Sequence, residues 1–338
     1  MSTPHSSRPV RTLRFHSYGE PIDVLRLERT GMPDPGAGRI RIAVYACGLT
    51  PADWALCRGL FPGALPRGIG LEASGIVDAV GSGVGGVAVG DRVLGIPDFA
   101  GVPVAGASDF AILNHWAPMP ASLEFAPAAA LPMAVETACR GLDRLRLQAG
   151  QTLLIHGAGT TVGFAAVQMA LRRGATVLAT AGDTYADRLR ALGAQVTAYG
   201  NGMAERVLRL AGGAVDLALD VAPVNLSSAV RGALPDLVRV VGGDPRRVLT
   251  VVDFAGAAAL GVRSIFDRDA ATTEDMALAR RYDVLGEFAQ LAAEGQFTIP
   301  IARTFALDDW RPALDISQSG HARGKLVLLP VLADVTDG

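Results

Sequence analysis

Short runs of β-type residues, separated by glycine and proline, fill the chain from about residue 11 to residue 120. The clearest runs are residues 39–45, 75–80 and 91–95, which are rich in valine, isoleucine and leucine. Several short strands with frequent turn residues between them are typical of a compact β-rich domain. We therefore expect the first third of the chain to form such a domain.

After residue 120 the pattern changes to apolar strands that alternate with amphipathic helices. Residues 133–145 have helical spacing, and Pro132 suits the first turn of that helix. The predicted strands are residues 152–156, 176–180, 215–220, 237–241 and 248–253. Largely apolar strands separated by helices are typical of a parallel sheet that is covered on both faces. The middle of the chain is thus predicted to form a Rossmann-type, doubly wound α/β domain.

The first two of these strands enclose a clear helix. Small and apolar residues recur between them at helical spacing, and Gly174 can end the helix. This arrangement predicts a βαβ unit. Further along, residues 278–294 are predicted to form a helix, and residues 325–329 a closing strand.

A glycine-rich turn links the first of these strands to its helix. It comprises Gly157, Ala158, Gly159, Thr160, Thr161, Val162 and Gly163. In such a turn, backbone N–H groups and the positive end of the helix can face a pyrophosphate, and small residues allow it to approach. The spacing is GxGxxxG and not GxGxxG, so the motif alone is weak, but its position between a strand and a helix strengthens it. An ordinary strand-to-helix turn is the alternative.

The end of the second strand bears on the choice of nucleotide. Thr180 and Ala181 occupy the place where a carboxylate would bind the ribose 2′-hydroxyl of NAD, so a 2′-phosphate is permitted there and NADP(H) is the expected cofactor. Asp183 lies just beyond and could reach the ribose. Arg188 and Tyr199 are candidate partners of the phosphate, although an arginine on a helix is more often a solvated surface residue.

Length and charge narrow the class of protein. The 338 residues favour two domains, and the near-neutral balance of 31 basic and 33 acidic side chains disfavours a nucleic-acid binder. No apolar run is long enough to predict a membrane-spanning helix. Cys47, Cys57 and Cys139 are too few and too scattered for a disulfide framework or a structural zinc site. The polar first residues do not form a signal peptide, so a cytoplasmic protein is expected.

Six segments together carry a family resemblance: residues 46–53, 70–77, 89–93, 131–138, 157–163 and 320–328. With these segments the chain resembles the medium-chain dehydrogenase/reductase superfamily, in its zinc-free, quinone-oxidoreductase-like branch. The resemblance implies a GroES-like substrate domain, residues 1–125 and 266–338, and a Rossmann NADP-binding domain, residues 126–265. It also implies hydride transfer from a nicotinamide in the cleft between them, and homodimers.

The resemblance also bears on metal binding. Zinc-dependent relatives have a histidine ligand where this chain has Leu71, and a cysteine ligand that aligns with Thr50. Glu72 cannot by itself supply the three protein ligands that a catalytic zinc needs, so no metal is expected. Cys47 lies near this position, and a lone buried cysteine is usually a small hydrophobic residue.

Reduction without a metal requires a hydrogen-bond donor for the oxygen that gains negative charge. Thr50 is the candidate catalytic and substrate-binding donor, where zinc-free relatives commonly have asparagine; a turn residue that bonds its own backbone is the alternative. Phe61, where relatives often have tyrosine, is a candidate substrate contact, and Asp53 is expected to cap the next helix. Thr137 matches a threonine that lies near the nicotinamide in relatives; a bond back to the preceding turn is the alternative.

These features predict a zinc-independent, NADPH-dependent oxidoreductase that transfers hydride to a quinone or an α,β-unsaturated carbonyl. One rival is a trans-acting enoyl reductase or a tailoring reductase of a natural product. Another is an NADPH-binding sensor or interaction protein with little turnover. Residues 61–67, 99–110 and 263–273 are the least family-like segments and are expected to shape the acceptor site. His156, at a strand end, is expected to pack and not to act as a base.

Overall fold

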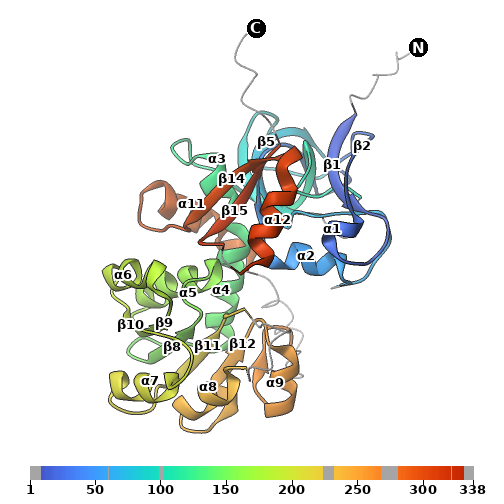
Figure 1. The fold of residues 1–338 in the computed structure, drawn as a ribbon. Coiled ribbons are helices and arrows are strands. Elements are labelled where there is room, and N and C mark those ends of the chain that lie inside the picture. Colours follow the sequence, from blue (N-terminus) through green and yellow to red (C-terminus); the bar gives the residue numbers. More distant parts are fainter. Residues whose placement is uncertain are drawn as a thin grey trace, which may run out of the picture. The chain divides into compact units, whose positions relative to one another are not determined.

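The computed structural model describes residues 9–59, 61–98, 103–223, 232–267, 281–320 and 322–330 (Figure 1). The chain divides into two compact units. Unit 1 comprises the described residues up to Met133 together with those from Tyr282 onward, and unit 2 runs from Ala134 to Arg281. The two ends of the chain therefore share one unit, and a single central segment forms the other.

Unit 2 contains a six-stranded parallel sheet in the order β10-β9-β8-β11-β12-β13. The strands are β8 (Thr152–His156), β9 (Thr176–Thr180), β10 (Gln195–Thr197), β11 (Leu217–Asp220), β12 (Val248–Thr250) and β13 (Arg263–Ser264). The order runs outward in both directions from β8 and β11, which is the doubly wound arrangement predicted from the sequence. Ligands of such sheets bind where the order reverses, at the carboxyl ends of the strands.

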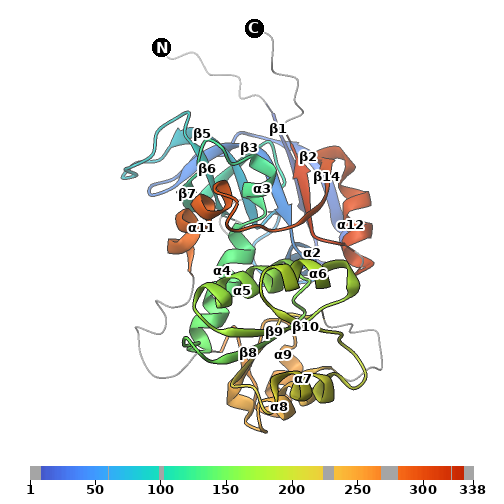
Figure 2. The ribbon, with the colours of Figure 1, turned by 90° about the vertical axis from the view of Figure 1, so that its left-hand side faces the viewer.

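Helices cover both faces of this sheet. They are α4 (Pro132–Arg144, which begins in unit 1), α5 (Thr161–Arg172), α6 (Asp183–Ala191), α7 (Met203–Ala211), α8 (Leu234–Val240) and α9 (Phe254–Leu260), with a 3₁₀ turn, η1 (Pro245–Arg247). Figure 2 shows α5 and α6 on one face of the sheet and α7 and α8 on the other. The core beneath α7 and α8 is continuous with Leu154 and Leu178 of the central strands.

The predicted strand over residues 237–241 is wrong, because this segment belongs to helix α8. Leu234, Leu237 and Val240 are buried at a spacing of three residues, while Asp236 and Arg239 between them are exposed. That spacing places the apolar side chains on one helical face. A short apolar run cannot by itself distinguish a buried strand from a helix.

Unit 1 is rich in β-structure. Its larger sheet has the order β14-β15-β3-β5-β6-β7, and β3 also pairs with β7, so that β3, β5, β6 and β7 close on themselves; its smaller sheet has the order β2-β1-β4. The strands are β1 (Val10–Phe15), β2 (Leu25–Thr30), β3 (Ile40–Leu49), β4 (Arg67–Gly68), β5 (Glu72–Val80), β6 (Arg92–Pro97), β7 (Phe110–Pro118), β14 (Ile301–Ala306) and β15 (Lys325–Leu329). The β-rich domain predicted for the first third of the chain is thus confirmed and gains strands from the C-terminal segment.

Short helices surround these sheets: α1 (Pro21–Val24), α2 (Pro51–Cys57), α3 (Phe125–Ala129), α11 (Leu285–Ala293) and α12 (Trp310–Gln318), with 3₁₀ turns η2 (Tyr282–Val284) and η3 (Leu307–Asp309). The helix predicted over residues 278–294 corresponds to η2 and α11, and residues 278–280 lie outside the described residues. Of the helices in the described parts of the chain, none has the length and apolar character needed to cross a membrane.

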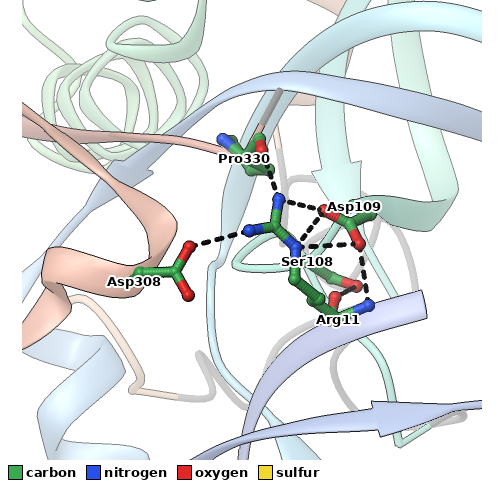
Figure 3. A network of polar contacts seen from close by, with 5 residues as sticks. All are labelled: Arg11, Ser108, Asp109, Asp308 and Pro330. Carbon is green, nitrogen blue, oxygen red and sulfur yellow. Dashed lines mark hydrogen bonds and ion pairs between the residues drawn. The ribbon is translucent and has the colours of Figure 1, made fainter. Parts of the chain in front are cut away.

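Arg11 ties together segments from both ends of the chain (Figure 3). Its Nη2 lies 2.8 Å from Asp109 Oδ1 and 2.6 Å from the carbonyl oxygen of Pro330, and its Nη1 lies 2.7 Å from Asp308 Oδ2. The core of unit 1 likewise combines Leu13 of β1 with Leu314 of α12 and residues of β15. The C-terminal segment is thus an integral part of this unit.

Candidate functional site

The glycine-rich turn joins β8 to α5 and brings the helix very close to the strand end. A Cβ on Gly163 would lie 2.3 Å from the carbonyl oxygen of Gly157, and Gly157 has a φ of +84° that favours glycine. A Cβ on Gly159 would meet the ring of Tyr185 at 3.3 Å. The outer glycines are therefore required by the backbone path, while Gly159 makes room for a packed aromatic side chain.

Thr160 is the N-cap of α5. Its Oγ1 accepts a hydrogen bond from the Gly163 N–H at 3.0 Å and donates one to the Gly157 carbonyl at 2.9 Å. The hydroxyl proton of Thr160 is therefore engaged within the turn. The cap satisfies one of the backbone donors that a helix N-terminus leaves open.

Three N–H groups of the turn point to anion binding. Within the described part of the chain, the backbone nitrogens of Gly159, Thr161 and Val162 donate to no acceptor, whereas those of Gly157 and Ala158 donate to Thr180. Open N–H groups at the amino end of a 12-residue helix favour a negatively charged ligand. The turn therefore fits a diphosphate, and its fit rests on backbone groups and not on charged side chains.

Thr180 anchors the turn from the end of β9. It is fully buried, and its Oγ1 lies 2.7 Å from His156 Nδ1 and 3.2 Å from the Gly157 nitrogen. Ala181, the next residue, donates its N–H to the carbonyl of Thr197. Burial lowers the pKa of His156 to about 4, so the imidazole is neutral at neutral pH. His156 is thus a buried side chain, as expected, and Thr180 holds the first residue of the glycine-rich turn by a hydrogen bond.

A row of polar side chains continues across the carboxyl ends of the central strands. The register pairs His156 with Asp220 of β11, and Asp220 with Thr250 of β12. Thr250 Oγ1 donates to Asp220 Oδ2 at 2.8 Å, and burial raises the pKa of Asp220 to about 6. Asp220 and Thr250 were not among the predicted site residues. Their signal was available, because each is the last residue of an otherwise apolar strand.

The proposed phosphate partners lie in different places. Tyr199 is 61% exposed and lies next to Gly182, since a Cβ on that glycine would be 3.6 Å from the Tyr199 hydroxyl oxygen. Arg188 lies farther along α6, with its guanidinium 5.4 Å from the ring centre of Phe164 and 5.9 Å from that of Tyr185. The structure therefore brings Tyr199, but not Arg188, to the start of α6. Asp183, the first residue of α6, is also exposed there.

Thr137 lies on α4 and is half-buried. Its Oγ1 lies 3.3 Å from Oε2 of Glu136, to which it donates, and no bond back to the preceding turn forms. Glu136 is fully buried and pairs with Arg140 at 2.7 Å. The hydroxyl of Thr137 is thus part of a buried charged cluster.

In unit 1, Thr50 and Asp53 begin helix α2. Asp53 Oδ2 accepts hydrogen bonds from the Thr50 nitrogen at 2.7 Å and from Thr50 Oγ1 at 3.0 Å, and Oδ1 accepts from the nitrogens of Gly70 and Leu71 at 2.7 and 3.1 Å. Asp53 therefore caps the helix, as expected, and also holds the segment before β5. Although these bonds favour the charged carboxylate, its complete burial raises the pKa of Asp53 to about 6.

Glu72 and Lys325 form a buried ion pair beside this cap. Glu72 is fully buried, Lys325 is 2% exposed, and Glu72 also accepts the N–H of Met133 at 2.8 Å. Gly48 makes room, because a Cβ there would lie 2.4 Å from Glu72 Oε1. Burial raises the pKa of the neighbouring Cys47 thiol, so that residue is a neutral core side chain.

Lys325 was not among the predicted site residues, although it is the only lysine of the chain. In the part of the chain that the structure describes, no three His, Cys, Asp or Glu side chains are grouped so that they could hold a metal ion. Phe61 lies in an exposed loop, has a φ of +53° and is 44% exposed.

Two family models match the chain. Residues 36–109 match the alcohol dehydrogenase GroES-like domain, and residues 192–328 match a family described as zinc-binding dehydrogenase. The first match falls in unit 1, and the second begins in unit 2 and ends in β15.

Individual proteins are similar over parts or all of the chain. Rat quinone oxidoreductase is 36% identical over 186 residues, which are 53% of this chain and 55% of the rat protein. Erythronolide synthase EryA2 of Saccharopolyspora erythraea is 44% identical over 158 residues, 46% of this chain but 4% of the synthase. The crystal structure of CurK enoyl reductase matches with a TM-score of 0.76 and 26% identity over 95% of this chain and 99% of that one. The sequence matches thus span about half of the rat protein and a small part of the synthase.

Proposed function

Because the chain belongs to the medium-chain dehydrogenase/reductase superfamily, we propose that it is a zinc-independent, NADPH-dependent oxidoreductase that reduces a quinone or an α,β-unsaturated carbonyl. The observation that carries the proposal is the turn after β8, where Gly159, Thr161 and Val162 offer open N–H groups to an anion. Residues 126–265 are then the nucleotide domain, and residues 1–125 with 266–338 the substrate domain. We also expect homodimers, as in relatives.

A reduced nicotinamide, when bound, supplies the hydride. The chain's own contribution begins with the diphosphate, which the three open N–H groups would hold. Neither Thr180 nor Ala181 places a carboxylate at the end of β9, and Tyr199 is exposed beside Gly182, which supports NADPH; the exposed Asp183 opposes it. Thr137 would lie near the nicotinamide.

Thr50 is the proposed proton donor to the acceptor. In the ionised state of Asp53, the Thr50 hydroxyl donates to this carboxylate and its proton is engaged. When Asp53 is protonated, it can donate to Thr50 Oγ1, and the hydroxyl proton becomes available to the acceptor. As hydride adds to the conjugated system, the acceptor oxygen takes the proton of Thr50, Asp53 replaces it, and Asp53 regains a proton from solvent. The raised pKa of Asp53, about 6, supports this role.

Two features support chemistry without zinc. Leu71 and Thr50 carry side chains that are poor ligands for zinc, which prefers nitrogen and sulfur donors with some carboxylates. Glu72, the carboxylate next to Leu71, is engaged by Lys325 and by the Met133 nitrogen.

The test is steady-state oxidation of NADPH by the purified chain with a panel of quinones, enones and enoyl thioesters. We expect turnover of at least one class, and a loss of about 10²-fold in kcat for Thr50→Ala if its hydroxyl acts on the developing oxyanion. Thr50→Ser, which keeps the hydroxyl, is the matched variant. Unchanged turnover in Thr50→Ala would remove Thr50 from the mechanism.

A second candidate is an enoyl reductase that serves a carrier-bound or natural-product substrate. The identity to erythronolide synthase over 158 residues and the full-length likeness to CurK enoyl reductase favour it. Turnover of enoyl thioesters without turnover of free quinones would select this function. Binding of NADPH without oxidation by any acceptor would instead favour a nucleotide-binding protein with little turnover.

A further inference from the structure

Arg67 is a buried cation of unit 1 whose hydrogen bonding is incomplete. It is 3% exposed, its Nη1 donates to the Phe61 carbonyl at 2.5 Å, and its buried Nε has no acceptor. Among the described residues, no carboxylate forms an ion pair with it. Arginine is almost never fully buried unless it is paired, because desolvation of an isolated charge is costly. Among the described residues, the buried Nε of this guanidinium thus has no partner, and a bound anion could supply one.

Other arginines of this protein show what the guanidinium edge of Arg67 that contains Nε would bind. Several present Nε and Nη2 side by side to one carboxylate, namely in the pairs Arg11–Asp109, Arg58–Glu20 and Arg140–Glu136. Arg58 donates from Nε to Glu20 Oε2 at 3.1 Å and from Nη2 to the same oxygen at 2.7 Å, and Figure 3 shows this edge at Arg11. At Arg67 the opposite nitrogen, Nη1, is turned to Phe61, which leaves the Nε edge for a planar oxyanion.

Three large side chains near Arg67 in the sequence or in space are partly exposed. Tyr18, Phe61 and Leu65 are 38%, 44% and 38% exposed, although each is large and mostly apolar. The Tyr18 hydroxyl donates to the Gly63 carbonyl at 2.9 Å and accepts from the Gly63 nitrogen at 2.7 Å. These bonds and the nearby Arg67 lower the pKa of Tyr18. The guanidinium is close to the same glycine, since a Cβ on Gly63 would lie 3.8 Å from Arg67 Nη1. Partly exposed side chains of largely apolar character thus lie in the segment just before the buried positive charge and, at Tyr18, beside it.

The position is also within reach of the proposed proton donor. Gly70, whose nitrogen donates to Asp53 at 2.7 Å, follows Arg67 by three residues, which span at most about 11 Å of extended chain. Asp53 in turn binds the hydroxyl of Thr50. The segment that holds Asp53 thus also carries Arg67, so a molecule bound at Arg67 could extend toward Thr50.

We propose that Arg67 binds the carboxylate of an apolar small molecule whose body packs against Tyr18, Phe61 and Leu65. The assignment of this molecule as the acceptor rests on the proposed function, which then becomes reduction of a conjugated carbonyl compound that carries a carboxylate. Because Nε is buried in the free chain, the side chains that cover it move as the ligand enters.

A matched pair of acceptors tests the proposal: 4-(4-carboxyphenyl)-3-buten-2-one and its methyl ester. For the unmodified chain we expect kcat/KM to be at least about tenfold higher for the acid than for the ester, as the loss of a charged hydrogen bond implies. Arg67→Gln should bring this ratio close to one. Arg58→Gln, which removes an exposed arginine of the same unit, should leave it unchanged. A ratio near one in the unmodified chain, or a ratio preserved in Arg67→Gln, would overturn the proposal.

A binding experiment separates this site from the proposed reaction. Sodium benzoate should raise the Tm of the unmodified chain and of Arg58→Gln more than benzyl alcohol does, and should not raise that of Arg67→Gln. If no acceptor is turned over but this pattern holds, the proposed function fails and the carboxylate site stands. Equal stabilisation of Arg67→Gln and the unmodified chain would overturn the site.

Arg67→Lys guards against misfolding of the glutamine variant. It keeps a cation near the Phe61 carbonyl but lacks the paired edge, so both the acid preference and the benzoate response should fall. An unchanged acid preference in Arg67→Lys would contradict the paired contact. A loss of stability in either variant with the acid preference intact would assign Arg67 a purely structural role.

Discussion

The buried pair of Glu72 and Lys325 gives a quantitative prediction for the stability of unit 1. Glu72→Gln keeps an oxygen for the Met133 N–H but leaves the Lys325 ammonium, which is 2% exposed, without its counter-charge. Breaking a buried ion pair from one side costs about 3–5 kcal/mol, because the remaining charge is desolvated and unpaired. At 2–4 °C per kcal/mol for a unit of this size, the Tm of unit 1 should fall by roughly 6–20 °C.

The double variant Glu72→Gln with Lys325→Met distinguishes this cause from a simple loss of packing. Replacement of both charges by uncharged side chains of similar volume is often close to neutral, so the double variant should recover most of the lost stability. Differential scanning calorimetry and urea unfolding measure all the variants. Glu20→Gln, which breaks the exposed pair with Arg58, is the control and should change little. If the effects of the two single changes simply add in the double variant, the reasoning is refuted.

Three further predictions concern the candidate site. Gly163→Ala places a Cβ 2.3 Å from a backbone oxygen of the turn. The affinity for NADPH, measured by calorimetry, should therefore be lost or fall by at least about tenfold. Retained affinity would show that the turn can relax. Thr160→Ala removes the cap of α5 and should lower the free energy of unfolding by about 1 kcal/mol in urea titrations; an unchanged value would show that the cap is not stabilising. Activity should fall as the pH rises through about 6, where Asp53 loses its proton. This decrease with pH should vanish in Thr50→Ala, while any decrease caused by Asp220 should remain. A pH profile identical in Thr50→Ala would contradict the proton path.

Local patterns were sufficient to predict the parallel sheet. The predicted bounds of β8, β9 and β15 match the structure, because each is an apolar run bounded by polar, glycine or proline residues. The segment 237–241 has the same composition but folds as α8, since Pro235 begins a helix and the buried residues recur every three positions. Strand β7 was missed, because its polar Asn114 and His115 interrupt the apolar pattern.

The candidate site was predictable only where it is local in sequence. The glycine-rich turn and the Thr50–Asp53 cap lie within a few residues, so spacing identifies them. The bonds of Asp53 to Gly70 and Leu71 cross 17 and 18 residues, and the contact of Glu72 with Lys325 crosses 253. Such contacts depend on the packing of both chain ends into one unit, which composition and periodicity do not encode.

The central claim is that the amino end of α5 binds the diphosphate of a pyridine dinucleotide. Isothermal titration calorimetry of the full chain with NADPH and with NADH tests it most directly, with Gly163→Ala as the control. We expect one NADPH per chain, bound more tightly than NADH, and no comparable heat for the variant. Absence of binding for both dinucleotides would contradict the account.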